Sequence, residues 1–225
     1  MVDPRQINSV IFDFDGTLCS GRYFEPLGSD ALDAIGSLVF GDNATQWADP
    51  WMKGEFSSRD IASYLSKHLP ESEEEILSAL RQGCSQMTFN AAVYDFAIQQ
   101  RAADRKTALV TANMDVFTET VVPAHGFDAL FNIVLNTADH RTLDKSALWR
   151  AALTSFGPTH SFSSALLIDD SPRMITLFSS LGGNAYQYTG EEAFRDWLEE
   201  TGFFKKAQHE TAHTDGDFAT RHSGS

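Results

Sequence analysis

One stretch decides the fold of this chain: Val10-Ile11-Phe12-Asp13-Phe14-Asp15-Gly16-Thr17-Leu18. Its apolar start predicts a buried strand over residues 10–14, and Asp13 and Asp15 stand at positions i and i+2 at the end of that strand. Side chains two residues apart in a strand share one face, so the two carboxylates are expected to lie together. Paired carboxylates repel each other unless a cation or a proton intervenes. The stretch therefore predicts a divalent metal site that contains one nucleophile and one acid/base group.

The composition limits the class of partner. The chain has 225 residues, of which 42% are hydrophobic, enough for one large domain or for one domain with a smaller insert. Its net charge of −14 argues against nonspecific nucleic-acid binding, which needs a basic surface, and against an anionic membrane surface. The first residues are polar and no apolar run approaches a membrane span, so we expect a cytoplasmic protein. Cys19 and Cys84 are too few for a disulfide framework or a zinc site.

The second half of the chain alternates between strands and helices, which predicts a parallel sheet. The expected strands cover residues 107–111, 131–135, 164–169 and 185–188, and a predicted helix follows each of them. The first strand is separated from these by roughly 80 residues of helical pattern, far more than an ordinary strand-to-helix connection. The pattern therefore predicts a doubly wound parallel α/β core that a helical insert interrupts.

The expected boundaries follow from this alternation. The core comprises residues 1–18 and 90–204, and the helical insert comprises residues 19–89. Because the insert leaves directly after the two carboxylates, it is expected to lie over them as a cap. Residues 205–225 are polar and rich in His, Thr and Gly, which predicts a disordered tail.

Polar residues also follow the other predicted strands. They are Thr111 and Asn113 after the second strand, Lys145 after the third, and Asp169 and Asp170 after the fourth. The carboxyl ends of parallel strands lie at one edge of a sheet, so these side chains should gather beside the first two carboxylates. An oxygen-rich acidic cluster without His or Cys suits Mg²⁺, which takes few protein carboxylates and shares its other positions with water and phosphate.

In this order, the residues resemble the four signature motifs of the haloacid dehalogenase superfamily: Asp13-Phe14-Asp15-Gly16-Thr17, Thr111, Lys145 and Asp169-Asp170. The insert is similar to the helical cap of the first structural subclass of that superfamily. The resemblance implies a Rossmann-like core with a cap. It favours the phosphatase-like branch, because the dehalogenases as a rule lack a carboxylate at the position of Asp15. The chain departs from a common form of the third motif, since Ser146 rather than proline follows Lys145.

The resemblance also implies catalytic roles. Asp13 attacks phosphorus and forms an aspartyl-phosphate, while Asp15 protonates the leaving oxygen and then deprotonates the hydrolytic water. Thr111 and Lys145 bind the transferred phosphoryl group and offset its charge. Asn113 orients either a phosphoryl oxygen or an acidic neighbour.

For the metal, the resemblance implies a magnesium ion bound by Asp13, by the main-chain carbonyl of Asp15, and by Asp170. Asp169 either binds the metal directly or contacts the groups that bind it. The expected function is Mg²⁺-dependent hydrolysis of a small phosphorylated metabolite. Two alternatives stay open: a sugar phosphomutase on the same core, and a noncatalytic phosphate-binding or regulatory protein.

Overall fold

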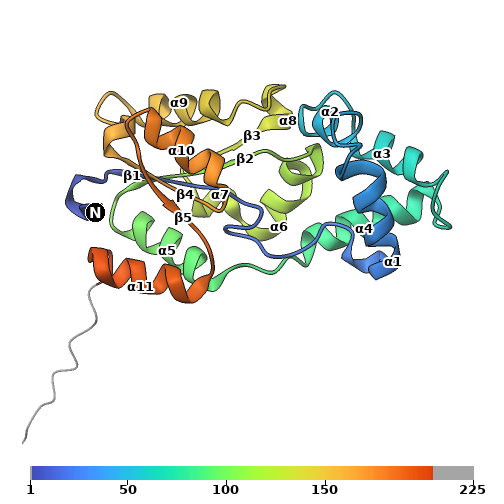
Figure 1. Ribbon diagram of the computed structural model, residues 1–225, viewed down its shortest axis with the longest axis horizontal. Helices are drawn as coiled ribbons and strands as arrows, with labels where there is room; N and C mark the ends of the chain where they lie inside the picture. Colours follow the sequence, from blue (N-terminus) through green and yellow to red (C-terminus); the bar gives the residue numbers. More distant parts are fainter. Residues whose placement is uncertain (1, 205–225) are drawn as a thin grey trace, which may run out of the picture.

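Within residues 2–204, which the computed structural model describes, five parallel strands form one sheet (Figure 1). They are β1 (Ser9–Phe12), β2 (Lys106–Thr111), β3 (Ile133–Asn136), β4 (Ala165–Asp169) and β5 (Asn184–Gln187). Their order is β3-β2-β1-β4-β5, so the chain starts in the middle of the sheet and winds first to one edge and then to the other. The doubly wound parallel core predicted from the sequence is confirmed. The tail expected over residues 205–225 lies outside the described residues.

The register of the central strand sets the position of the acidic residues. Phe12, the last residue of β1, lies opposite Leu109 of β2 and Ile168 of β4. Asp13 follows Phe12 and Asp169 follows Ile168, and the N–H of Asp13 donates to the carbonyl of Ile168 at 2.9 Å. The two carboxylates therefore leave neighbouring strands at the same level.

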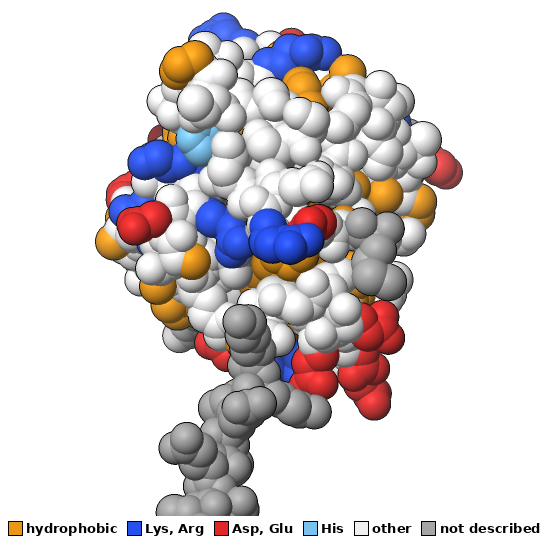
Figure 2. Space-filling model, turned by 90° about the vertical axis from the view of Figure 1, so that its left-hand side faces the viewer, with side chains coloured by type: hydrophobic (Ala, Val, Ile, Leu, Met, Phe, Trp, Pro, Cys, Tyr) orange, Lys and Arg blue, Asp and Glu red, His pale blue; other side chains and the backbone are white. Residues whose placement is uncertain are grey.

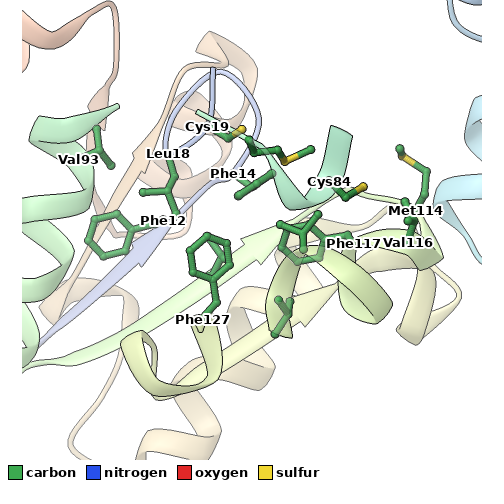
Figure 3. Packing of buried hydrophobic residues seen from close by; sticks show 14 of the residues in the cluster. Phe12, Phe14, Leu18, Cys19, Cys84, Val93, Met114, Val116, Phe117 and Phe127 are labelled. Carbon is green, nitrogen blue, oxygen red and sulfur yellow. The ribbon is translucent and has the colours of Figure 1, made fainter. Parts of the chain in front are cut away.

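Phe12 and Phe14 anchor the acidic motif in the core. Figure 3 shows both rings among the buried side chains of one cluster, next to Phe117 and Phe127. The ring centroid of Phe14 lies 4.8 Å from that of Phe117 and 5.9 Å from that of Phe127, both in the edge-to-face arrangement that aromatic rings prefer. Because successive residues of an extended chain point in opposite directions, burial of the two rings directs the intervening carboxylate of Asp13 away from this cluster.

Helices cover both faces of the sheet, as an all-parallel sheet requires. Two long helices pack on each face: α5 (Ala91–Ala102) and α11 (Glu191–Thr201) on one, α9 (Lys145–Phe156) and α10 (Pro172–Ser180) on the other. Phe96 meets Phe194 on the first face, and Trp149 meets Phe178 on the second. Two 3₁₀ turns precede strands, η1 (Pro4–Gln6) and η5 (Phe162–Ser164). None of the helices within residues 2–204 combines the length and apolarity that crossing a membrane requires.

The segment after β2 does not form one continuous helix. A π-helical turn, η4 (Phe117–Val121), leads into the single turn α6 (Val122–His125), and α7 (Phe127–Leu130) follows. Pro123 has no N–H to donate into a helix, and Gly126 ends α6 in the left-handed conformation at φ +67°. A further short helix, α8 (Thr137–His140), follows β3.

The insert, residues 19–89, lies beyond the carboxyl ends of the strands (Figure 1). Its elements are η2 (Glu25–Leu27), α1 (Ser29–Ile35), the π turn η3 (Gly36–Phe40), α2 (Ala48–Met52), α3 (Ser58–Leu65) and α4 (Glu73–Ser85). Capping boxes start α3 and α4, formed by Ser57 with Asp60 and by Ser72 with Glu75. Helix α1 ends at Ile35 because Gly36, a weak helix former, begins the wider π turn.

The two connections between the insert and the core run side by side. The N–H of Ser20 donates to the carbonyl of Thr88 at 3.0 Å, and the N–H of Asn90 donates to the carbonyl of Leu18 at 2.9 Å. The Asn90 side chain also donates to the carbonyl of Thr17 at 2.6 Å. Entry to and exit from the insert are thus joined in one narrow neck next to the acidic motif.

The insert is also tied to the core away from this neck. Asp115, at the start of the helical segment that leads into η4, accepts hydrogen bonds from the indole N–H of Trp51 and the main-chain N–H of Ser58, each at 2.8 Å. The hydroxyl of Thr137 donates to the carbonyl of Met52 at 2.8 Å. The conformation described here therefore holds the helical insert against the carboxyl ends of β2 and β3.

The opposite end of the molecule, where the strands begin, carries basic side chains. Figure 2 shows this face, with Lys and Arg side chains in a band across its middle. A pocket of about 260 Å³ at the start of β2 is lined by Arg101, Arg105 and Lys106 together with Asp104 and Asn132. The acidic groups predicted to be functional lie at the other end of the sheet.

Candidate active site

A buried ammonium group joins two of the predicted carboxylates. Lys145 Nζ lies 2.8 Å from Oδ1 of Asp13 and 2.9 Å from Oδ2 of Asp169. Asp169 is fully buried at the end of β4, and its second oxygen accepts the N–H of Ser171 at 2.9 Å. Burial alone would lower the pKa of Lys145, but the charges of Asp13 and Asp169 outweigh it and raise that pKa. The ammonium therefore stays charged beside the candidate nucleophile.

Local structure at the start of α9 places this lysine. Asp144 is the N-cap residue, and its Oδ1 accepts the N–H of Ser146 at 2.9 Å. Proline at position 146 has no N–H, so it could not make this cap. The serine that departs from the common form of the motif thus contributes a hydrogen bond that fixes the first turn, and Lys145 points into the acidic cluster.

Three carboxylates form a group that fits a divalent cation. Asp13, Asp169 and Asp170 each offer one oxygen, and these oxygens lie within 4.8 Å of one another. Burial, followed by the charge of Asp13, raises the pKa of both Asp169 and Asp170, which shows how unfavourable their joint ionisation is without a cation. The ligand atoms are all oxygen and few in number, which matches the preference of Mg²⁺.

Gly16 allows one of these carboxylates to approach. A Cβ atom at position 16 would lie 2.5 Å from Oδ2 of Asp170, and the backbone of Gly16 has φ +74°. A side chain here would therefore collide with the acidic cluster and strain the loop. On the other side of Asp170, the hydroxyl of Thr17 lies 3.5 Å from Oδ1. The glycine and threonine of the motif shape the position of Asp170.

Asp15 occupies a separate environment from the three-carboxylate group. Its Oδ2 accepts a hydrogen bond from Asn113 Nδ2 at 2.7 Å, and the Tyr23 hydroxyl lies 3.2 Å from Oδ1 and 3.3 Å from Oδ2. Burial, followed by the charge of Asp13, raises the pKa of Asp15 to about 7. A carboxyl group that titrates near neutral pH can give and take a proton under working conditions, as general acid–base catalysis requires.

Thr111 and Asn113 extend the site along the end of β2. Both are buried, and Asn113 Nδ2 lies 3.5 Å from the hydroxyl of Thr111. The main-chain N–H of Asn113 donates to the side chains of Asn136 and Thr137, each at 3.1 Å, which fixes the loop. Of the two roles expected for Asn113, the structure shows a contact with an acidic neighbour, Asp15.

Tyr23 is the member of this site that sequence reasoning missed. It lies in the insert just before η2, and its hydroxyl also accepts a hydrogen bond from Asn113 Nδ2. No diagnostic spacing links a tyrosine at this position to the acidic motif, because the intervening loop sets the contact. Burial, followed by the charge of Asp15, raises the pKa of Tyr23 well above its ordinary value, so the phenol remains a proton donor.

Comparisons with known proteins agree with this architecture. A sequence model of the family described as haloacid dehalogenase-like hydrolase matches residues 10–157, which include Asp13, Asp15, Thr111 and Lys145. No curated protein matches the chain.

Similar solved structures share the fold over most of their length. A HAD family enzyme from Bacteroides thetaiotaomicron, in complex with magnesium and inorganic phosphate, has a TM-score of 0.61 and 14% identity, covering 82% of this chain and 95% of that chain. A HAD-like family hydrolase from Porphyromonas gingivalis has a TM-score of 0.64 and 15% identity, with coverages of 89% and 100%. L-2-haloacid dehalogenase from Xanthobacter autotrophicus has a TM-score of 0.50 and 16% identity, with coverages of 86% and 83%.

Proposed function

Because this chain belongs to the haloacid dehalogenase-like hydrolase family, we propose that it is a Mg²⁺-dependent phosphatase that hydrolyses a small phosphorylated metabolite. The observation that carries the proposal is Asp15, which stands two residues after the candidate nucleophile Asp13 and whose carboxyl pKa is raised to about 7 by burial. Phosphate-ester cleavage needs a proton for its leaving oxygen, and Asp15 is placed to supply one. The structure from Bacteroides thetaiotaomicron, with magnesium and inorganic phosphate, supports the same chemistry.

In the proposed mechanism, a carboxylate oxygen of Asp13 attacks phosphorus while Asp15 gives its proton to the leaving oxygen. The bond between phosphorus and that oxygen breaks, the alcohol leaves, and an aspartyl-phosphate remains on Asp13. Asp15, now ionised, takes a proton from a water molecule that attacks the aspartyl-phosphate. Inorganic phosphate leaves, and Asp13 and Asp15 return to their starting states.

Other groups of the chain stabilise charge during these steps. The ammonium of Lys145, 2.8 Å from Asp13, offsets the negative charge on the phosphoryl oxygens. Thr111 donates a hydrogen bond to these oxygens, and Asn113 donates either to them or to Asp15. Asp13, Asp170 and the main-chain carbonyl of Asp15 would hold Mg²⁺. Asp169 would either bind the ion as a further ligand or contact the groups that bind it. When bound, Mg²⁺ supplies positive charge that offsets both the carboxylates and the phosphoryl group.

We assign the insert, residues 19–89, the role of a cap on a catalytic core of residues 1–18 and 90–204. Two observations support this role. The insert joins the core through a narrow neck, closed by the hydrogen bonds of Ser20 with Thr88 and of Asn90 with Leu18, and Tyr23 of the insert contacts Asp15. A capped site favours a small substrate over a phosphorylated protein. Closure of the cap would exclude water from the first step.

The test is phosphate release from a panel of phosphorylated metabolites, with Mg²⁺ and with excess chelator, using Asp13→Asn as the inactive control. The proposal predicts Mg²⁺-dependent release that the Asp13→Asn variant lacks. Transfer of phosphate within a sugar, without release, would identify a phosphomutase instead. Binding of phosphate esters with no chemical change would point to a noncatalytic protein.

A further inference from the structure

A pocket of about 260 Å³ adjoins Asp15 on its insert side. Its walls come from the loop before η2 and from the α1–η3 segment: Tyr23, Phe24, Leu32, Ile35 and Phe40. Phe24 and Ile35 are buried, and the other three side chains are partly buried. These side chains present mainly hydrocarbon to the cavity. Asp15 and Tyr23 belong both to this pocket and to the candidate active site.

The position of the proton donor decides which part of a substrate faces this pocket. In the proposed mechanism the phosphoryl group lies against Asp13 and Lys145, whereas the leaving oxygen must lie within hydrogen-bond reach of Asp15. The alcohol attached to that oxygen therefore extends from Asp15 away from Lys145. The cavity next to Asp15 offers it space.

The chemistry of the walls then limits the alcohol. A polyhydroxylated group placed among hydrocarbon walls would lose its hydrogen bonds to water without gaining protein partners, which is unfavourable. An apolar group of similar shape would instead bury hydrophobic surface. The charged lining residues Arg22 and Asp33 are solvent-exposed, so they do not supply buried partners for hydroxyl groups.

We propose that this pocket is the leaving-group site and that the preferred substrate is the phosphate monoester of a compact, apolar alcohol, aromatic or alicyclic. The inference rests on the proposed phosphatase function and deepens it by naming the substrate class. It sets this chain apart from an enzyme that hydrolyses sugar phosphates.

The chain offers a variant that adds bulk at the pocket wall without strain. Gly36 lines the cavity, and a Cβ atom at this position would meet no other atom within 4 Å. Its backbone angles, φ −53° and ψ −45°, are those of an ordinary helical residue, so Gly36→Leu is sterically acceptable. Ser37→Leu is the matched control, since Ser37 is exposed and does not line the pocket.

The experiment compares cyclohexylmethyl phosphate with glucose 6-phosphate, two esters of similar shape that differ in hydroxyl groups, and with methyl phosphate, which is too small to fill the pocket. The expected kcat/KM for cyclohexylmethyl phosphate exceeds that for glucose 6-phosphate by roughly tenfold or more, the usual size of discrimination by a hydrophobic pocket. In Gly36→Leu the ratio of kcat/KM for cyclohexylmethyl over methyl phosphate should fall by about the same factor. In Ser37→Leu that ratio should not change. Equal or higher kcat/KM for glucose 6-phosphate would overturn the inference.

Binding measurements separate failure of this inference from failure of the proposed function. Hydrolysis neither of these three esters nor of any ester in the metabolite panel would contradict the phosphatase function, whereas hydrolysis of panel esters but of none of these three would overturn the inference alone. Titration calorimetry with cyclohexylmethylphosphonate and methylphosphonate examines the pocket in either case. Tighter binding of the cyclohexylmethyl compound, lost in Gly36→Leu, supports the pocket as an apolar-group site. Equal affinity of the two phosphonates overturns it.

Discussion

The hydroxyl of Tyr23 donates a hydrogen bond to the carboxylate of Asp15, with Oη 3.2 Å from Oδ1 and 3.3 Å from Oδ2. This contact joins a residue of the insert to the acidic motif that follows β1. Asn113 Nδ2 holds the same carboxylate from the core side at 2.7 Å. The orientation of the candidate acid/base therefore depends on both parts of the molecule.

Replacement of Tyr23 by phenylalanine keeps the ring and removes the donor. We expect kcat for an alkyl phosphate to fall by about tenfold with little change in KM, because the hydroxyl acts through Asp15 rather than on the substrate. The effect should be smaller for nitrophenyl phosphate, whose leaving group hardly needs a proton. Steady-state kinetics on both esters measures this. An equal fall in kcat for both would show that Tyr23 does not act through proton transfer.

Removal of the Asp15 charge should stabilise the metal-free protein in alkaline solution. The folded-state pKa of Asp15 is raised to about 7, so the ionised carboxylate is less favourable in the folded than in the unfolded chain. The stability of the wild-type protein should therefore fall as pH rises from about 4 to about 7, and Asp15→Asn should lack this contribution. At pH 8 the free energy of unfolding of Asp15→Asn should exceed that of the wild-type protein by at most about 4 kcal/mol, since each pKa unit corresponds to about 1.4 kcal/mol.

Urea unfolding at pH 4.5 and pH 8 in the presence of chelator measures this difference. Asp42→Asn, which changes an exposed carboxylate of the insert, is the matched control and should not alter stability appreciably. Equal stability of Asp15→Asn and the wild-type protein at pH 8 would refute the assigned burial of this charge.

The acidic cluster predicts a specific response to metals. Activity should require Mg²⁺, because the one positive charge of Lys145 does not balance the three neighbouring carboxylates of Asp13, Asp169 and Asp170. Ca²⁺ should inhibit, since it prefers more oxygen ligands in a looser geometry and could bind both oxygens of Asp13, which would prevent attack on phosphorus. Phosphate release with Mg²⁺ while Ca²⁺ is added tests this. Full activity in excess chelator would contradict the assigned metal site.

The neck between insert and core should behave as a hinge. We expect the amides of Ser20 and Asn90, which donate across the neck, to change their hydrogen exchange when Mg²⁺ and a phosphate mimic bind. The amide of Asn8, which donates to Ser164 at the other end of the sheet, serves as the internal control. If hydrogen exchange at the neck is the same with and without ligand, the prediction that the cap closes on binding is wrong.

The strand ends could be predicted because parallel topology brings them to one edge. Asp13, Asp169 and Asp170 stand at the ends of β1 and β4, whose pairing places them at the same level, and Lys145 begins α9, the long helix between β3 and β4. The positions of the three carboxylates and of Lys145 follow from the order of strands and helices alone. The contact between Lys145 and Asp13 was foreseeable for this reason.

The contribution of the insert could not be predicted in the same way. Tyr23 reaches Asp15 only because the loop before η2 folds back over the acidic motif, and periodicity carries no information about such a loop. Short elements such as α2, α7 and α8, of four or five residues, likewise lack enough residues to show a period. The π turns at η3 and η4 divide segments whose apolar spacing alone predicts one continuous helix.

The central claim is that Asp13 takes the phosphoryl group while Asp15 supplies the proton to the leaving oxygen. Its most direct test is the single-turnover rate of alcohol release by Asp15→Asn, relative to the wild-type enzyme, for an alkyl phosphate and for nitrophenyl phosphate. We predict a loss of roughly 10²- to 10⁴-fold for the alkyl ester, the usual size of general acid catalysis, and a much smaller loss for the nitrophenyl ester. Equal losses with the two esters would contradict the role of Asp15 as the general acid.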